Sequence, residues 1–158
     1  MRPPIIFLDI DGVLLPDQVQ TSPALLDEMT DYQPYDPGCV EAMNAIIAAI
    51  SPVIVLHSSR RYQYSQIEFC QIFIASGILT ASPIVLPTYG QDAGLFFSSP
   101  NREKEHDISE YLRRQKICWH VVLDDEVLNV DRLHLICPDV GLTVADARTI
   151  IAMLTVDA

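Results

Sequence analysis

The apolar run from Ile5 to Leu8 leads directly into Asp9, Ile10, Asp11 and Gly12. A short continuous apolar run is typical of a strand that is buried on both faces of a parallel sheet. Open α/β sheets place their binding sites at the carboxyl ends of such strands. Two carboxylates at that position repel each other unless a cation lies between them. Mg²⁺ suits this position because it takes oxygen ligands and leaves room for a substrate phosphate.

The rest of the chain alternates between apolar strand candidates and helical patterns. Strands are expected near residues 4–9, 52–58, 83–86, 119–124 and 132–137, with helices over 40–50, 62–76, 101–115 and 143–154. This alternation predicts a parallel sheet with helices on both faces. The fold class is therefore α/β, a three-layer Rossmann-like fold with a five-stranded parallel sheet, in a single domain over residues 1–158.

Cap and breaker residues indicate where several of these helices begin and end. Asp36 and Pro37 are expected at the start of the first helix, and Gly77 at the end of the second. Thr143 is the expected N-cap of the last helix, with Asp146 three residues later. Residues 12–36 fit neither pattern, and predict a turn, a short helix around 23–29, or a flap over the site.

Charge and hydropathy favour a cytoplasmic protein. No apolar run approaches the roughly 18 residues of a membrane span, and the N-terminus leads into the first strand without a signal-peptide pattern. The four cysteines have no CxxC spacing, which favours reduced thiols. A formal charge of −11 disfavours nonspecific nucleic-acid binding.

Further polar residues follow the other strand candidates or open a helix. The apolar run that ends at Leu56 leads into His57 and Ser58, and the run that ends at Leu123 leads into a second acid pair, Asp124 and Asp125. Lys104 lies in the first turns of the third predicted helix, where an anion is already favoured by the helix dipole. These side chains are expected to meet at one edge of the sheet.

In this order the motifs resemble those of the haloacid dehalogenase (HAD) superfamily. The resemblance implies a Mg²⁺-dependent phosphatase in which Asp9 is the nucleophile and forms an aspartyl-phosphate, and Asp11 is the general acid and base. Ser58 would bind a phosphoryl oxygen and Lys104 would neutralise its charge. The metal would be held by Asp9, the main-chain carbonyl of Asp11 and Asp125, with Asp124 as a supporting ligand or orienting group.

Several of these positions have competitors in the sequence. His57 takes the place of the Ser58 hydroxyl if the strand is shifted by one residue. Arg102 and Lys116 compete with Lys104, although Lys104 lies four residues before the inward-facing Ile108. Arg60 is expected to be exposed, with contact to a substrate phosphate or carboxylate as the alternative.

Two stretches are similar to a narrower branch, the HAD domain of Swiss-Army-knife RNA-repair proteins. Residues 57–60 (His-Ser-Ser-Arg) resemble the Ser-Ser-Trp-Arg pattern of that branch, although this chain lacks the tryptophan. Residues 141–143 (Gly-Leu-Thr) resemble its ending before the last helix.

The spacing leaves no room for the folded cap domain that many members of the superfamily carry. The site is therefore expected to be open, for a macromolecular phosphate end or for a small phosphate enclosed by a second subunit of a homo-oligomer. A non-catalytic binding or regulatory module of the same fold is the main alternative function. A receiver-like domain fits less well, because its phosphorylated acid normally follows a later, central strand.

Overall fold

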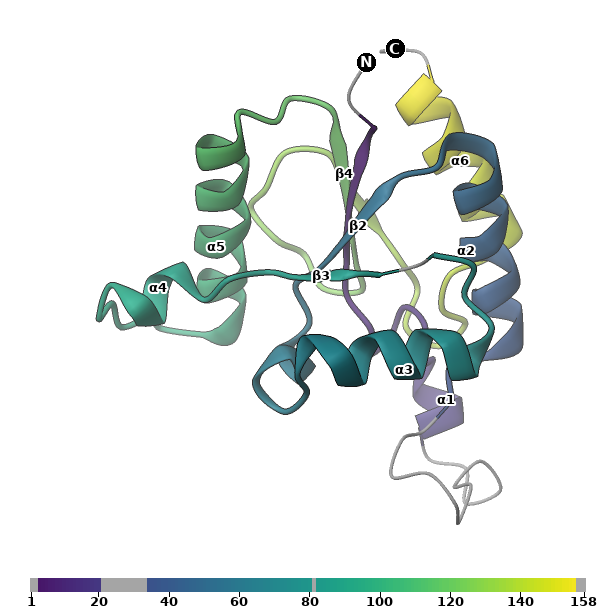
Figure 1. Ribbon diagram of the computed structural model, residues 1–158, viewed down its shortest axis with the longest axis horizontal. Coiled ribbons are helices and arrows are strands. Elements are labelled where there is room, and N and C mark those ends of the chain that lie inside the picture. The colour runs from purple at the N-terminus through teal and green to yellow at the C-terminus, as the bar shows by residue number, and fades with distance from the viewer. Residues whose placement is uncertain (1–2, 21–33, 81, 156–158) are drawn as a thin grey trace.

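The computed structural model describes residues 3–20, 34–80 and 82–155 (Figure 1). Within these residues a five-stranded parallel sheet has the order β3-β2-β1-β4-β5. Its strands are β1 (Ile5–Leu8), β2 (Val53–Leu56), β3 (Ile84–Val85), β4 (His120–Asp124) and β5 (Leu133–Leu135). The predicted α/β class with five parallel strands is confirmed.

The central strand β1 sets the position of the site. In its register, Leu8 lies opposite Leu56 of β2 and Leu123 of β4. The backbone pairing continues one step further, because the His57 amide donates to the Leu8 carbonyl at 3.1 Å and the Asp9 amide donates to the Leu123 carbonyl at 3.0 Å. The residues that follow these three strands therefore share one edge of the sheet.

Helices cover both faces of the sheet, as predicted. They are α1 (Asp17–Gln20), α2 (Pro37–Ile50), the 3-10 helix η2 (Ser59–Tyr62), α3 (Gln66–Ser76), α4 (Tyr89–Asp92), α5 (Pro100–Gln115) and α6 (Val144–Thr155). Figure 1 shows α2 and α6 side by side on one flank of the sheet and α5 on the other. No helix in the described residues is long and apolar enough to cross a membrane.

Alternate residues of the strands enter two separate hydrophobic clusters. Leu8, Leu56 and Leu123 belong to the larger cluster, together with residues of α2, α3 and α6. Phe7 belongs to the smaller cluster, which α5 closes with Ile108 and other residues. Since successive side chains of a strand point to opposite faces, both faces need a helical cover, and this explains the continuous apolar runs in the sequence.

The predicted helix ends are mostly confirmed. Asp36 caps α2 by accepting from the amides of residues 38 and 39, and Gly77 ends α3 with a positive φ. Thr143 and Asp146 hydrogen-bond each other's backbone amides at the start of α6.

The helix predicted over residues 62–76 starts four residues later in the structure, at Gln66. Residues 59–62 form η2, and α3 begins only after Ser65, whose side chain forms a capping box with Glu68. A second cap inside the helical pattern therefore divides it. In the 12–36 region, α1 occupies residues 17–20, and the helix expected around 23–29 lies outside the described residues.

Gly141, which precedes α6, allows its own segment to pack closely against the segments of Cys39 and Val13. Its φ is +73°, and a Cβ atom there would lie 2.6 Å from Cys39 Sγ and 2.8 Å from the carbonyl oxygen of Val13. Gly94 has a similar φ of +70°, but a Cβ atom would have nothing within 4 Å. Gly94 is therefore a matched control for the backbone conformation alone.

We expect Gly141→Ala to lower the free energy of unfolding by roughly 1–3 kcal/mol more than Gly94→Ala does, because only the first adds an overpacked methyl group. Both variants share the cost of a left-handed backbone in a residue other than glycine, about 1–2 kcal/mol. Urea unfolding of the two variants measures the difference. Equal losses would contradict the packing role of Gly141.

Candidate active site

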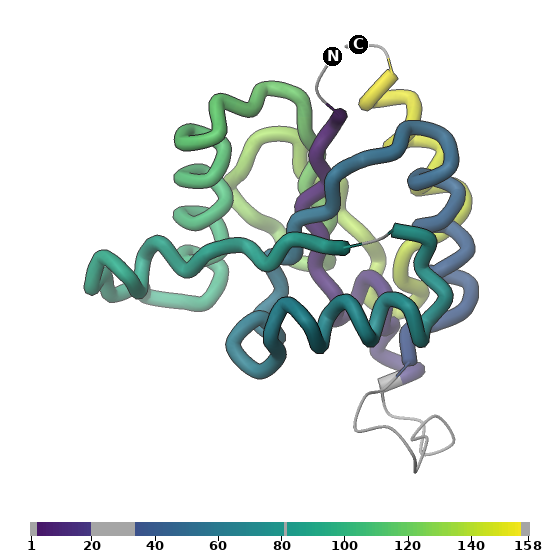
Figure 2. The backbone as a smooth tube through the Cα atoms, in the orientation of Figure 1, coloured from purple at the N-terminus to yellow at the C-terminus, as the bar shows by residue number. Residues whose placement is uncertain are grey.

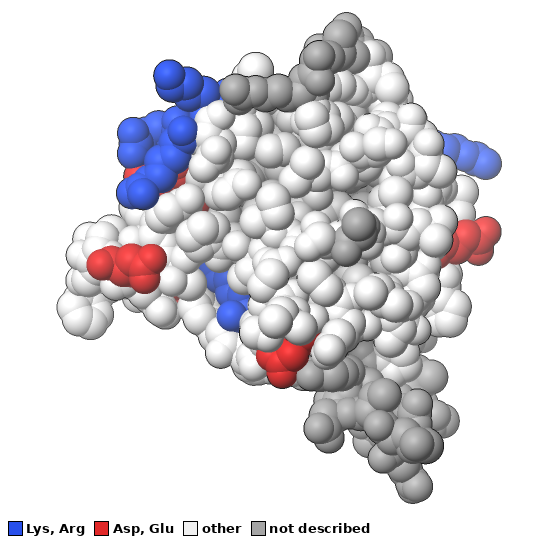
Figure 3. All heavy atoms as spheres, in the orientation of Figure 1, with Lys and Arg blue, Asp and Glu red and all other residues white. Residues whose placement is uncertain are grey.

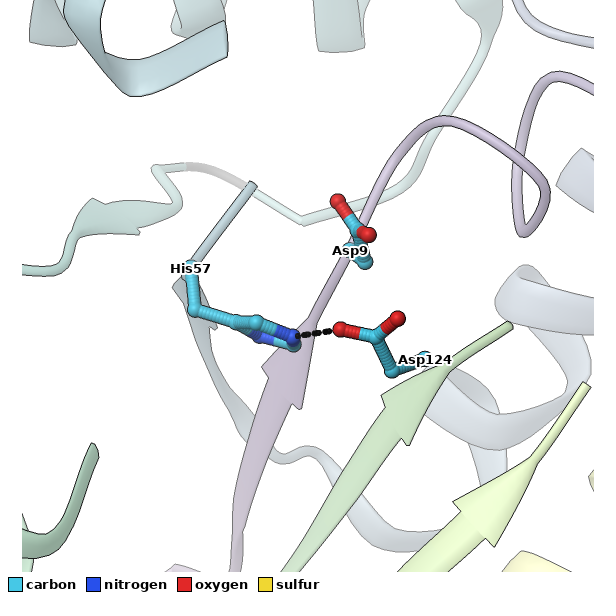
Figure 4. Close-up of side chains that lie close together, drawn as sticks. All are labelled: Asp9, His57 and Asp124. Atoms are coloured by element: carbon cyan, nitrogen blue, oxygen red, sulfur yellow. Dashed lines mark hydrogen bonds and ion pairs between the residues drawn. The ribbon is translucent and has the colours of Figure 1, made fainter. Parts of the chain in front are cut away.

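Asp9, His57 and Asp124 converge at the carboxyl edge of the sheet, after β1, after β2 and at the end of β4. One ligand atom from each lies within 4.8 Å of the others, and all three residues are buried. Figure 4 shows the His57 ring pointing to Asp124, with Nε2 2.8 Å from Asp124 Oδ2 and the Asp9 carboxylate beside them. A carboxylate only accepts, so His57 donates from Nε2.

Lys104 reaches this group from the second turn of α5. Its Nζ donates to Asp9 Oδ2 at 2.9 Å and to Asp124 Oδ2 at 3.1 Å. Although burial by itself favours the neutral amine, the charges and hydrogen bonds of Asp9 and Asp124 outweigh it and raise the pKa of Lys104. The buried lysine is thus a fixed positive charge between two carboxylates.

The other oxygens of the two carboxylates are held by backbone amides. Asp9 Oδ1 accepts from the amide of Ile10 at 2.8 Å, and Asp124 Oδ1 accepts from the amide of Glu126 at 2.9 Å. Burial opposes ionisation of Asp124, but His57 and Lys104 prevail and lower its pKa to about 2. Asp124 is therefore ionised, and its oxygens are engaged by protein donors.

A second buried ion pair holds α5 in the position that brings Lys104 to Asp9. Asp107, one turn after Lys104, accepts from Arg61 of η2 at 2.6 Å and from the amide of Gly90 in α4 at 2.9 Å. Both side chains of the ion pair are almost completely buried. Our sequence reasoning missed these residues. The available signal was an acid on the apolar stripe of the helix, directly before Ile108.

Asp11 makes a different contact from Asp9. Its two carboxylate oxygens accept from Nε and Nη2 of Arg60 at 2.7–3.0 Å, in a bidentate pair at the partly exposed rim of the site. Hydrogen bonds from Arg60 to Asp11 raise the pKa of the guanidinium. The expectation of a simply exposed Arg60 is therefore wrong, because the arginine orients one of the two predicted acids.

Asp125 packs against Gly12, the glycine of the first motif. Gly12 has a φ of +75°, and a Cβ atom there would lie 2.4 Å from Asp125 Cγ, so the carboxylate occupies the space that a side chain would take. Burial, followed by the charges of Asp9 and Asp124, raises the pKa of Asp125 to about 7. Asp125 thus lies in a region with an excess of negative charge.

The donor set at this edge fits a hard divalent cation. Asp9 and Asp125 would supply carboxylate oxygens, and the charge of Asp9 that acts on Asp125 is the physical reason for a cation near them. Asp124 is already bound by His57 and Lys104. This favours the orienting role for Asp124 over that of a direct ligand.

The competitor of Ser58 lies in the site, whereas the competitors of Lys104 lie elsewhere. Ser58 is buried, but the contact of its Oγ is with the amide of Arg60, 3.3 Å away, where it caps η2. Its phosphate-binding role stays a prediction, whereas His57 contacts the acidic group directly. Arg102 forms a surface pair with Glu105, and Lys116 caps the far end of α5. Lys104 is the one of these three cations that contacts Asp9.

The comparison with known protein families matches residues 5–147 to the HAD domain in Swiss Army Knife RNA repair proteins. The chain belongs to this family. The match covers most of the chain and confirms both the superfamily and the narrower branch that the motifs predicted. The comparisons with curated proteins and with solved structures give no match.

The most voluminous hollow among the described pockets of this HAD domain lies away from the acids. It has a volume of about 670 Å³ and is lined by α5 residues, such as Ile108 and Leu112, and by His120. His120 begins β4 opposite Ile5, so this hollow lies toward the amino ends of the strands. Size alone therefore does not mark the site in this domain.

We expect Asp125→Asn to stabilise the metal-free HAD domain and to reduce its stabilisation by Mg²⁺. The substitution removes a like charge from beside Asp9 and Asp124, but it also removes the expected metal ligand. For the wild type, Mg²⁺ at 100 times its dissociation constant would add about 2.7 kcal/mol. Thermal unfolding with and without Mg²⁺ measures both effects, with the exposed Asp139→Asn as control. An unchanged Mg²⁺ response in Asp125→Asn would exclude Asp125 as a ligand.

Proposed function

We propose that this HAD domain is a Mg²⁺-dependent phosphomonoester hydrolase that acts through Asp9. The observation that carries the proposal is the buried contact of 2.9 Å between the Lys104 ammonium and the Asp9 carboxylate. A carboxylate approaches a dianionic phosphate only where positive charge cancels the repulsion between them. Lys104 supplies a fixed positive charge beside the attacking oxygen.

The proposed reaction has two displacements at phosphorus. In the first, an Asp9 oxygen forms a bond to phosphorus as the bond to the leaving oxygen breaks, and Asp11, parted from Arg60 and protonated before this step, gives that oxygen its proton. In the second, Asp11 takes a proton from water, which attacks phosphorus, and the aspartyl-phosphate bond breaks to release phosphate. A Mg²⁺ ion held by Asp9 and Asp125 would neutralise charge on the phosphoryl oxygens.

The surrounding side chains are suited to hold these groups in line. His57 and Lys104 fix the orientation of Asp124, and Arg60 fixes that of Asp11. Ser58 follows His57 and is proposed to bind a phosphoryl oxygen. Such preorganisation matters because phosphoryl transfer depends mainly on positioning and on electrostatic stabilisation.

We propose that the substrate is a phosphate at the end of an RNA strand. The family's description as a domain of RNA repair proteins supports this class of substrate. The net charge of −11 argues against it, but charge is unevenly distributed over the surface. Figure 3 shows a largely uncharged face with basic side chains gathered at the C-terminal end of α5, where Arg113 and Arg114 lie. These arginines pair with Glu110 and lie at the opposite end of α5 from Lys104, so contacts nearer the site would have to hold the RNA end.

We expect Asp9→Asn to lower kcat for an aryl phosphate in the presence of Mg²⁺ by at least about 10³-fold, as expected for loss of a nucleophile. The amide is nearly isosteric, so the far-ultraviolet circular dichroism should stay that of the wild type. Asp139→Asn, on the surface, serves as the matched control. Normal turnover by Asp9→Asn would remove Asp9 from the mechanism, and an inactive wild type would favour a binding module.

A further inference from the structure

The connection between α4 and α5 presents an aromatic side chain to solvent. Figure 2 shows α4 and the segment that follows it extending from the body of the molecule. Phe96 in this segment is fully exposed, and its neighbour Leu95 is about half exposed, at 46%. A single exposed apolar residue is common in proteins. A functional role for Phe96 therefore depends on whether its backbone is ordered and on which groups lie beside the ring.

Contacts on both sides of Phe96 fix the segment. The Phe97 ring packs at 5.3 Å from the His106 ring, and a Cβ atom on Gly90 would lie 2.4 Å from the Phe97 ring. The amide of Leu95 donates to the carbonyl of Gly90 at 2.9 Å. Since Phe97 and Leu95 are anchored on α4 and α5, the Phe96 ring is presented to solvent from an ordered backbone.

A groove of about 450 Å³ lies beside this ring. It is lined by Phe96, Phe97, Pro100 and Glu103, with polar groups of the segment between them. This volume is within the range of small-molecule sites. The Oε1 atom of Glu103 is buried and accepts no hydrogen bond from the described residues, while Tyr62 hydrogen-bonds the same carboxylate. A buried acceptor without a partner is unfavourable, and an N–H donor of a bound ligand would satisfy it.

The groove and the candidate active site share the start of α5. Glu103 directly precedes Lys104, whose ammonium contacts Asp9. The Tyr62 hydroxyl interacts with both Arg61 and Glu103, and therefore links η2, after β2, with the start of α5. A ligand whose phosphate lies at Asp9 would thus have the groove as the next surface along α5.

We propose that this groove binds the base of the phosphorylated nucleotide, with Phe96 as the stacking surface and Glu103 as the acceptor for base N–H groups. This inference rests on the proposed function. Nucleobases stack on exposed aromatic rings irrespective of their identity, and a carboxylate selects bases that present N–H donors. The negative charge of Glu103 excludes the phosphate from the groove, and the positive charge of Lys104 attracts it, so the orientation of the nucleotide is determined.

Guanine is the base that fits Glu103 best. It presents two adjacent N–H donor groups on its Watson–Crick edge, and Oε1 can accept from either, whereas the single N–H of uracil lies between two carbonyl acceptors that a carboxylate repels. The groove therefore predicts a preference for guanosine over uridine 3′-monophosphate, and a preference for both over a phosphate ester without a ring.

The test compares kcat/KM for guanosine 3′-monophosphate, uridine 3′-monophosphate and glycerol phosphate. For each nucleotide, kcat/KM is divided by kcat/KM for glycerol phosphate. We expect Phe96→Ala to lower this ratio by roughly 5- to 100-fold, the size of a base–aromatic stacking contact. Glu103→Gln should reduce the preference for guanosine over uridine. Ile74→Ala, at an exposed apolar position on α3, is the control.

A binding measurement separates this inference from the proposed function. Calorimetry with the Asp9→Asn variant and guanosine 3′-monophosphate should show binding that Phe96→Ala weakens by a similar factor. If the wild type hydrolyses no ester but this binding is found, the phosphatase proposal fails and the base groove holds. If nucleotides are hydrolysed and Phe96→Ala lowers kcat/KM equally for all esters, or for none, the base groove is overturned. Absence of both turnover and binding overturns both.

Discussion

The Lys104 ammonium between Asp9 and Asp124 is the interaction on which the geometry of the site depends. A buried carboxylate is costly unless it is paired and hydrogen-bonded, and Lys104 pairs with both acids at once. This contact requires three elements that are far apart in the sequence to meet. The ends of β1 and β4 must be neighbours in the sheet, and α5 must cross that edge at the correct height.

The position of α5 in turn depends on a second ion pair. Arg61 and Asp107 are buried together, and Asp107 also binds the backbone of α4. Removing one partner of such a pair leaves an uncompensated charge in the core. The Phe7 cluster beneath α5 provides apolar contact, which has no direction, whereas the ion pair specifies the rotation and height of the helix.

Negative charge at the sheet edge exceeds the positive charge that the protein provides there. Lys104 pairs with both Asp9 and Asp124, and Arg60 pairs with Asp11. Asp125 therefore adds a carboxylate beside two acids that already share one cation. The absence of a side chain at Gly12 makes room for this carboxylate. A Mg²⁺ ion would complete the balance, and the same excess of acid would exclude an anionic substrate in its absence.

The amino-acid pattern alone predicted the α/β class, the parallel sheet, most helix ends and the family, because apolar runs and cap residues are local signals that tertiary contacts here reinforce. It also indicated Asp9 and Lys104, since a strand end and the start of a helix are defined by neighbouring residues. The folded chain was needed to find that His57 contacts Asp124, that Arg60 pairs with Asp11, and that Arg61 and Asp107 are buried together. These pairs join residues 46–67 positions apart. Such contacts depend on strand order and helix rotation, for which a single sequence carries no local signal.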